Sequence, residues 1–197
     1  MNSNFSRRAV LAVFAGAAFF RPAYGLSTGQ ASDLVNRLVG EINTVINSGR
    51  SERQMYAEFE RIFTRYADVP IIARSALGVA ARSASQAQMN AFTTAFRGYI
   101  SRKYGREFRR FIGGELRVEQ ARPVKSFYEV KSTAYLRGEA PIDVIFLVSD
   151  RSGKNLFFNL YIEGVNILAT ERTEIGAMLD RRGGNLDALI RDLKTAG

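Results

Sequence analysis

The stretch DVPIIARSALGVAARSASQAQMNAFTTAFRGYISRKYGREFRRF, residues 68–111, decides the fold of this chain. Asp68 is a favourable N-cap for a short helix that ends near Gly78. Ser85 and Gln88 form a capping-box pattern that opens a longer helix. The long helix carries an apolar stripe: Met89, Phe92, Phe96, Tyr99, Ile100, Tyr104, Phe108, Phe111 and Ile112. The stretch has no catalytic nucleophile, metal-ligand cluster or phosphate loop, so the stripe favours binding of an apolar ligand.

Two more helices are predicted before this stretch. The first begins at Ser32 or Asp33, repeats apolar residues at helical spacing and ends at Gly49. The second runs from about Ser51 and places Tyr and Phe side chains on one face. The short link between them indicates an antiparallel pair.

After Gly113-Gly114 the apolar period changes from 3.6 to 2, which is typical of strands. Four strands are predicted, over residues 115–121, 127–137, 142–149 and 155–163. Two helices follow, near 173–181 and from Asn185 onward. The fold class is therefore α+β: N-terminal helices packed on a four-stranded curved antiparallel sheet with C-terminal helices, and an apolar cavity between the layers.

Residues 1–25 have the pattern of an export signal and residues 26–197 that of a single domain. Arg7 and Arg8 precede an uncharged apolar run, Ala9 to Phe20, and a small-residue cleavage site ends at Gly25. The apolar run is too short to span a bilayer. The paired arginines fit either a twin-arginine or an ordinary Sec signal, and a periplasmic location is expected.

Composition excludes several classes of chemistry. The 197 residues include no Cys and no His, which removes disulfides, thiol catalysis, the Ser-His-Asp triad and the commonest metal ligands. Without residues 1–25 the chain has 25 basic and 19 acidic residues, a net charge of +6. In an exported protein this favours anionic lipid or acidic protein surfaces over nucleic acid as a partner.

Short motifs across the chain resemble the MlaC family, the periplasmic phospholipid-binding proteins of the Mla (toluene-tolerance) ABC transport system. The resemblance covers about Ala31 to Leu193, and the order of elements agrees as well. Asn166 departs from the pattern, since a Ser usually follows Glu-Gly-Val. The motifs are Asp68, Leu77-Gly78, the Ser85 cap, Phe92, Phe96, Tyr99, Tyr104, Ile162-Glu163-Gly164-Val165-Asn166, Glu171-Arg172 and Gly184-Asn185-Leu186.

The resemblance implies a monomeric, non-enzymatic carrier that maintains outer-membrane lipid asymmetry by shuttling phospholipid across the periplasm. It implies no cofactor other than the phospholipid cargo. The implied partners are an inner-membrane ABC transporter with an MCE-domain subunit and an outer-membrane lipoprotein complex. Strand alternation and helical spacing select the expected lipid-binding residues: Val69, Ile72, Leu77, Phe96, Tyr99, Tyr104, Phe108, Val130, Leu136, Phe146, Val148, Phe158, Leu160 and Val165.

Other readings of the same features remain open at this stage. The aromatic stripe also suits the solid core of a periplasmic adaptor without ligand. The row Arg97, Arg102, Arg106 and Arg110 suits either a solvated face or a docking surface for acidic partners, and Arg172 and Lys131 are further candidates for headgroup contact. Glu163 would be the base of a small isomerase-like enzyme for a hydrophobic substrate, although no second acid or oxyanion partner is evident.

Overall fold

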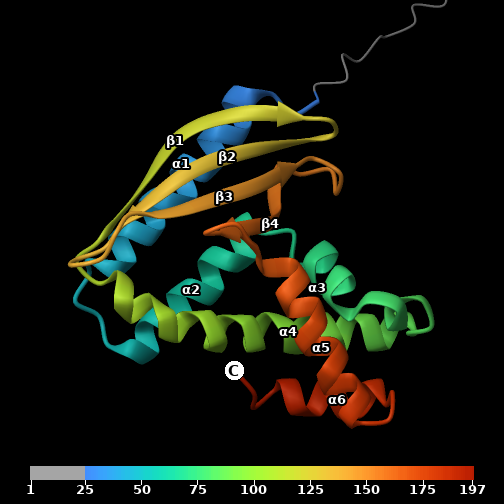
Figure 1. The fold of residues 1–197 in the computed structure, drawn as a ribbon. Coiled ribbons are helices and arrows are strands. Elements are labelled where there is room, and N and C mark those ends of the chain that lie inside the picture. Colours follow the sequence, from blue (N-terminus) through green and yellow to red (C-terminus); the bar gives the residue numbers. More distant parts are fainter. Residues whose placement is uncertain (1–24) are drawn as a thin grey trace, which may run out of the picture.

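The computed structural model describes residues 25–197, apart from the side chains of Glu52, Glu107, Phe108 and Arg109. The predicted export signal thus lies outside the described residues except for Gly25. Helices fill the first half of the described chain: α1 (Thr28–Ile46), α2 (Glu52–Tyr66), α3 (Val69–Leu77), the 3-10 turn η1 (Gly78–Arg82), α4 (Gln86–Glu107) and the 3-10 turn η2 (Phe108–Phe111). A sheet and two helices, α5 (Ile167–Arg181) and α6 (Leu186–Leu193), complete the predicted α+β order (Figure 1).

The helix starts follow their capping residues, with one correction. The Asp68 carboxylate accepts a hydrogen bond from the Ile71 N–H at 3.4 Å. The Ser85 hydroxyl accepts one from the Gln88 N–H at 3.1 Å, so the predicted capping box forms. However, α1 begins at Thr28 rather than after Ser32, because Ser27 forms its own capping box with Gln30.

The sheet has five antiparallel strands in the order β1-β2-β3-β4-β5. The four predicted strands are β1 (Glu115–Val124), β2 (Phe127–Tyr135), β3 (Ile142–Ser149) and β4 (Leu156–Ile162). The fifth, β5 (Val165–Asn166), has two residues, and it pairs with β4 across a tight turn in which Glu163 and Gly164 both have positive φ. The Asn166 side chain then caps α5, so this helix starts six residues earlier than predicted.

A β-bulge in β4 changes which side chains face the interior. Phe146 pairs with Leu160, but Val148 pairs with Phe157, so Phe158 is an extra residue in the ladder. The bulge lets both Phe157 and Leu160 face the same side of the sheet. Strict alternation along β4 predicts only one of them there.

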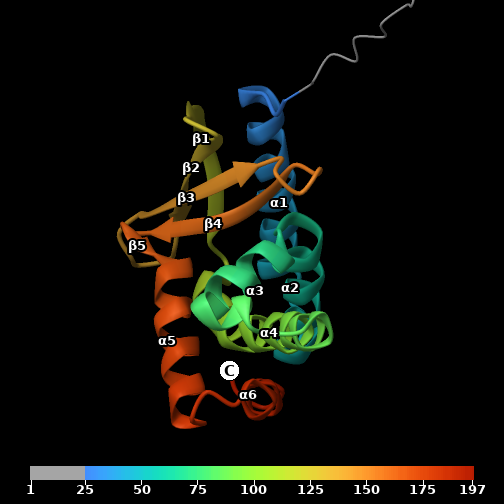
Figure 2. The same ribbon diagram turned by 90° about the vertical axis from the view of Figure 1, so that its right-hand side faces the viewer.

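The curved sheet arches over a layer of helices (Figures 1 and 2). Its inner face packs against α1, while α3 and the start of α5 meet β4. Below the sheet, α4 packs against α2 on one side and α6 on the other. No helix among residues 25–197 is long and apolar enough to cross a membrane.

Candidate functional site

An apolar cavity of about 300 Å³ lies between the sheet and the helices. Ligand pockets in proteins start at about this size. Its walls come from β1, β3 and β4, from Leu136 just after β2, and from α1 to α5, so the cavity is a consequence of the two-layer fold rather than of one loop. The lining residues are Leu38, Ile42, Phe59, Ile62, Phe63, Ile72, Phe96, Ile100, Tyr104, Arg110, Phe111, Leu116, Leu136, Ile142, Val144, Phe146, Phe157, Phe158, Asn159, Leu160, Ile162, Ile167, Leu168 and Glu171.

The sequence-predicted lining residues divide into three groups. Seven of them line the cavity: Ile72, Phe96, Tyr104, Leu136, Phe146, Phe158 and Leu160. Five are buried in the packed core and do not line it: Val69, Leu77, Tyr99, Val130 and Val148. Val165 is 53% exposed in β5, and the side chain of Phe108 lies outside the described residues.

Several lining residues were missed by sequence reasoning. Phe157 lines the cavity because of the bulge, and its ring packs edge-on against Phe146 with centroids 5.7 Å apart. Leu38 and Phe63 belong to apolar faces that the periodicity identified only as core. Helical spacing shows that each of these residues lies on a buried face of its helix. It does not show whether that face borders a cavity, because this depends on which helices face the sheet.

The predicted arginine row is largely occupied within the molecule. Arg102 donates to the Ala196 and Leu193 carbonyl oxygens at 2.8 and 2.5 Å, which satisfies the C-terminal end of α6. Arg106 donates to the Gly197 carbonyl oxygen. Arg97 pairs with Glu60 at 3.0 Å, and Arg110 pairs with Glu139 at 2.9 Å while lining the cavity. Two arginines of the row thus hold the C-terminal segment by hydrogen bonds, and the other two form ion pairs with carboxylates.

The other polar candidates lie away from the cavity. Arg172 lies against Gly78, at the end of α3, and does not line the cavity. Lys131 pairs with Asp143 at 3.3 Å. The Glu163 carboxylate accepts a hydrogen bond from the Asp143 N–H and stabilises the turn before β5. Within residues 25–197, no cluster of three or more potential metal ligands is present.

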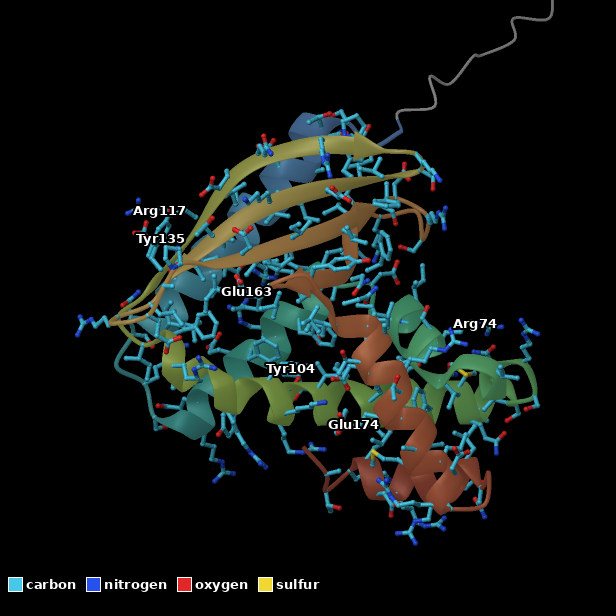
Figure 3. All side chains as sticks on the ribbon, viewed as in Figure 1. Arg74, Tyr104, Arg117, Tyr135, Glu163 and Glu174 are labelled. Carbon is cyan, nitrogen blue, oxygen red and sulfur yellow. The ribbon has the colours of Figure 1, made fainter. Side chains whose placement is uncertain are left out.

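A polar network joins α4 to α5 at the cavity wall. Glu171 lines the cavity and is 2% exposed, and one of its oxygens, Oε1, accepts hydrogen bonds from Lys103 Nζ at 2.7 Å and from Tyr104 Oη at 2.5 Å. Lys103 also pairs with Glu174, which in turn accepts from Tyr99 Oη at 2.6 Å. Figure 3 labels Tyr104, on α4 below the sheet, and Glu174, on α5. The ammonium group of Lys103 therefore forms ion pairs with two carboxylates, those of Glu171 and Glu174.

Burial and hydrogen bonding shift the pKa values within this network. Burial, and then the hydrogen bond to Glu174, raise the pKa of Tyr99 far above 10.0. Burial and the hydrogen bond to Glu171 do the same to the pKa of Tyr104. Burial alone would raise the pKa of Glu174, but hydrogen bonds from Lys103 and Tyr99 outweigh it and lower this pKa below 4.5.

These shifts predict how the network's stabilisation depends on pH. Since the tyrosine pKa values are raised on folding, their contribution is complete below pH 10.0 and falls as the pH rises further, where the unfolded tyrosines ionise. Since the pKa of Glu174 is lowered, its contribution is present above pH 4.5 and is lost as the pH falls below that value. Urea unfolding of the wild type and of Tyr99→Phe should show a smaller alkaline loss in the variant. Superimposable alkaline limbs would contradict this assignment.

Known proteins share both the sequence pattern and the fold of this chain. The family model described as MlaC protein matches residues 35–195. The fold is also similar to that of a phospholipid-binding protein from Ralstonia solanacearum, whose structure was determined in complex with a phospholipid. The TM-score is 0.71 at 18% sequence identity, and the match covers 83% of this chain and 94% of that one. The family match spans most of the chain and the fold agrees with it, and the chain belongs to the MlaC family.

Proposed function

We propose that this protein is a periplasmic phospholipid carrier that encloses acyl chains in the cavity between sheet and helices. The observation that carries the proposal is the cavity itself, whose wall is apolar apart from Tyr104, Arg110, Asn159 and Glu171. A solid-core adaptor would fill this space with side chains. The structure of the phospholipid-bound relative, which shares the fold, supports the choice of cargo.

The magnitude of apolar burial explains retention of such a cargo. Each buried methylene contributes about 0.8 kcal/mol, so two acyl chains of about 16 carbons gain on the order of 20 kcal/mol before ordering costs. We expect the acyl chains to contact the seven predicted residues that line the cavity together with Phe157. We therefore expect release at a membrane to be slow for the protein alone and to be accelerated by a partner that opens the cavity.

The proposal also covers the location, the partners and the oligomeric state of the protein. The export signal predicted at residues 1–25 supports a periplasmic location, between the two membranes that would exchange lipid. We propose the MCE-domain ABC transporter of the inner membrane and the lipoprotein complex of the outer membrane as its partners, and a monomeric carrier between them. Binding and release without catalysis is consistent with the engagement of Tyr104, Arg110 and Asn159 in hydrogen bonds or an ion pair within the protein.

Transfer of lipid between two vesicle populations tests the carrier function. Delipidated protein is incubated with donor vesicles holding a labelled phospholipid, separated, and added to unlabelled acceptor vesicles. The expected result is protein-bound label after the first step and label in the acceptors after the second, in proportion to protein. Label that never leaves the donors in the presence of folded protein would contradict the proposal.

A further inference from the structure

The cavity contains one polar group that the fold leaves incompletely satisfied. Of the two carboxylate oxygens of Glu171, Oε1 accepts from Lys103 and Tyr104, whereas Oε2 is buried and has no hydrogen-bond partner among the described residues. A buried polar atom without a partner costs about 1–3 kcal/mol, and more when it is charged. Such an atom calls for an explanation, and in a ligand-binding cavity a donor supplied by the ligand is one.

The charge around Glu171 indicates what kind of donor is missing. Glu171 and Glu174 share Lys103 as their contacting cation, and Arg181 acts on Glu174 only at longer range. The network therefore retains an excess of negative charge beside an apolar wall. A cationic donor would be attracted to it, and an anionic group would be repelled.

The position of Glu171 in the wall brings this site within reach of a headgroup. Ile167 and Leu168, one turn earlier on α5, also line the cavity but are only half-buried. Thr170, Arg172 and Thr173 on the same helix are exposed. This part of α5 is thus a wall one helix thick between cavity and solvent, and the polar end of an amphipathic ligand bound there would lie close to water while its chains extend inward.

We propose that Glu171 selects the cargo headgroup by accepting, through Oε2, a hydrogen bond from an ammonium N–H of the lipid. The inference deepens the proposed carrier function and rests on it. It predicts a preference for lipids with a primary ammonium, such as ethanolamine phospholipids. Quaternary choline headgroups carry the same charge but have no N–H, and glycerol headgroups have hydroxyl donors but leave the lipid anionic.

A headgroup series on the wild-type protein tests the inference without any mutation. Delipidated protein is loaded from vesicles of equal parts phosphatidylethanolamine, its N-methyl and N,N-dimethyl forms, phosphatidylcholine and phosphatidylglycerol, all with the same acyl chains. Native mass spectrometry of the re-isolated protein gives the ratio of bound lipids. A charge-assisted hydrogen bond predicts about tenfold enrichment of phosphatidylethanolamine over phosphatidylcholine, with the sharpest drop when the last N–H is lost, and low phosphatidylglycerol.

Two matched variants locate the selectivity. Glu171→Gln and Glu174→Gln each remove one charge from the same network, but only Glu171 lines the cavity. We expect Glu171→Gln to reduce the enrichment to about twofold or less and Glu174→Gln to retain it, with both folded by circular dichroism. Equal binding of ethanolamine and choline lipids by the wild type would overturn the inference, as would retention of phosphatidylglycerol at the ethanolamine level or unchanged enrichment in Glu171→Gln. Failure to take up any lipid would instead contradict the carrier function itself.

Discussion

Leu160→Arg is expected to leave the protein folded and to lower its bound phospholipid by tenfold or more. Leu160 lies on β4, faces Phe146 across the β3–β4 ladder and lines the cavity while remaining half-buried. The arginine stem can lie along the wall and its guanidinium can reach solvent, so the fold tolerates it. The charge nevertheless stands in the space that acyl chains need, and burying it beside hydrocarbon is strongly unfavourable.

Ile145→Arg is the matched control for this variant. Ile145 is also aliphatic and half-buried, but it pairs with Lys131 and Tyr161 and does not line the cavity. Lipid extracted from the two purified variants should fall only in Leu160→Arg. Equal lipid content in both folded proteins would show that the cavity does not hold the cargo.

Among the substitutions considered, Lys103→Met is expected to cause the largest loss of stability, about 3 kcal/mol in the free energy of unfolding. The substitution keeps an apolar stem of similar length but leaves Glu171 buried without its cation and removes the pairing of Glu174. It also removes the ammonium group that lies 5.5 Å from the ring centroids of Tyr99 and Tyr104. In a chain of this size, thermal unfolding should shift downward by about 10 °C.

A double mutant separates charge from packing in this prediction. In Lys103→Met/Glu171→Gln the buried carboxylate is neutral, so more than half of the lost stability should return. Urea unfolding of the wild type, both single variants and the double variant provides the cycle. If the double variant were as unstable as the sum of the two single variants, the loss would come from packing, and the charge argument would be contradicted.

Local signals in the sequence predicted most of the architecture. Asp68, Ser85 and Asn185 cap the helices they were predicted to cap, because a capping side chain acts on backbone N–H groups two or three residues away. The change of apolar period at Gly113-Gly114 correctly separated helices from strands. Asn166 departs from the family's turn motif in sequence, and in the structure its side chain caps α5.

The cavity was predictable in kind but only partly in its residues. Helical spacing identified the α4 stripe, yet it could not separate Phe96, which lines the cavity, from Tyr99, which packs between α4 and α5. The bulge at Phe158 is a tertiary feature, so alternation missed Phe157. The role of Glu171 depends on Lys103 and Tyr104, which lie 68 and 67 residues away in the chain.

Native mass spectrometry of the protein purified from a bacterial periplasm tests the central claim most directly, when followed by organic extraction and lipid analysis. The account predicts that the protein carries a mass excess equal to one or two phospholipids, and that the same lipids appear in the extract. A mass equal to that of the bare polypeptide, with no uptake from added vesicles, would contradict it and favour an adaptor without ligand.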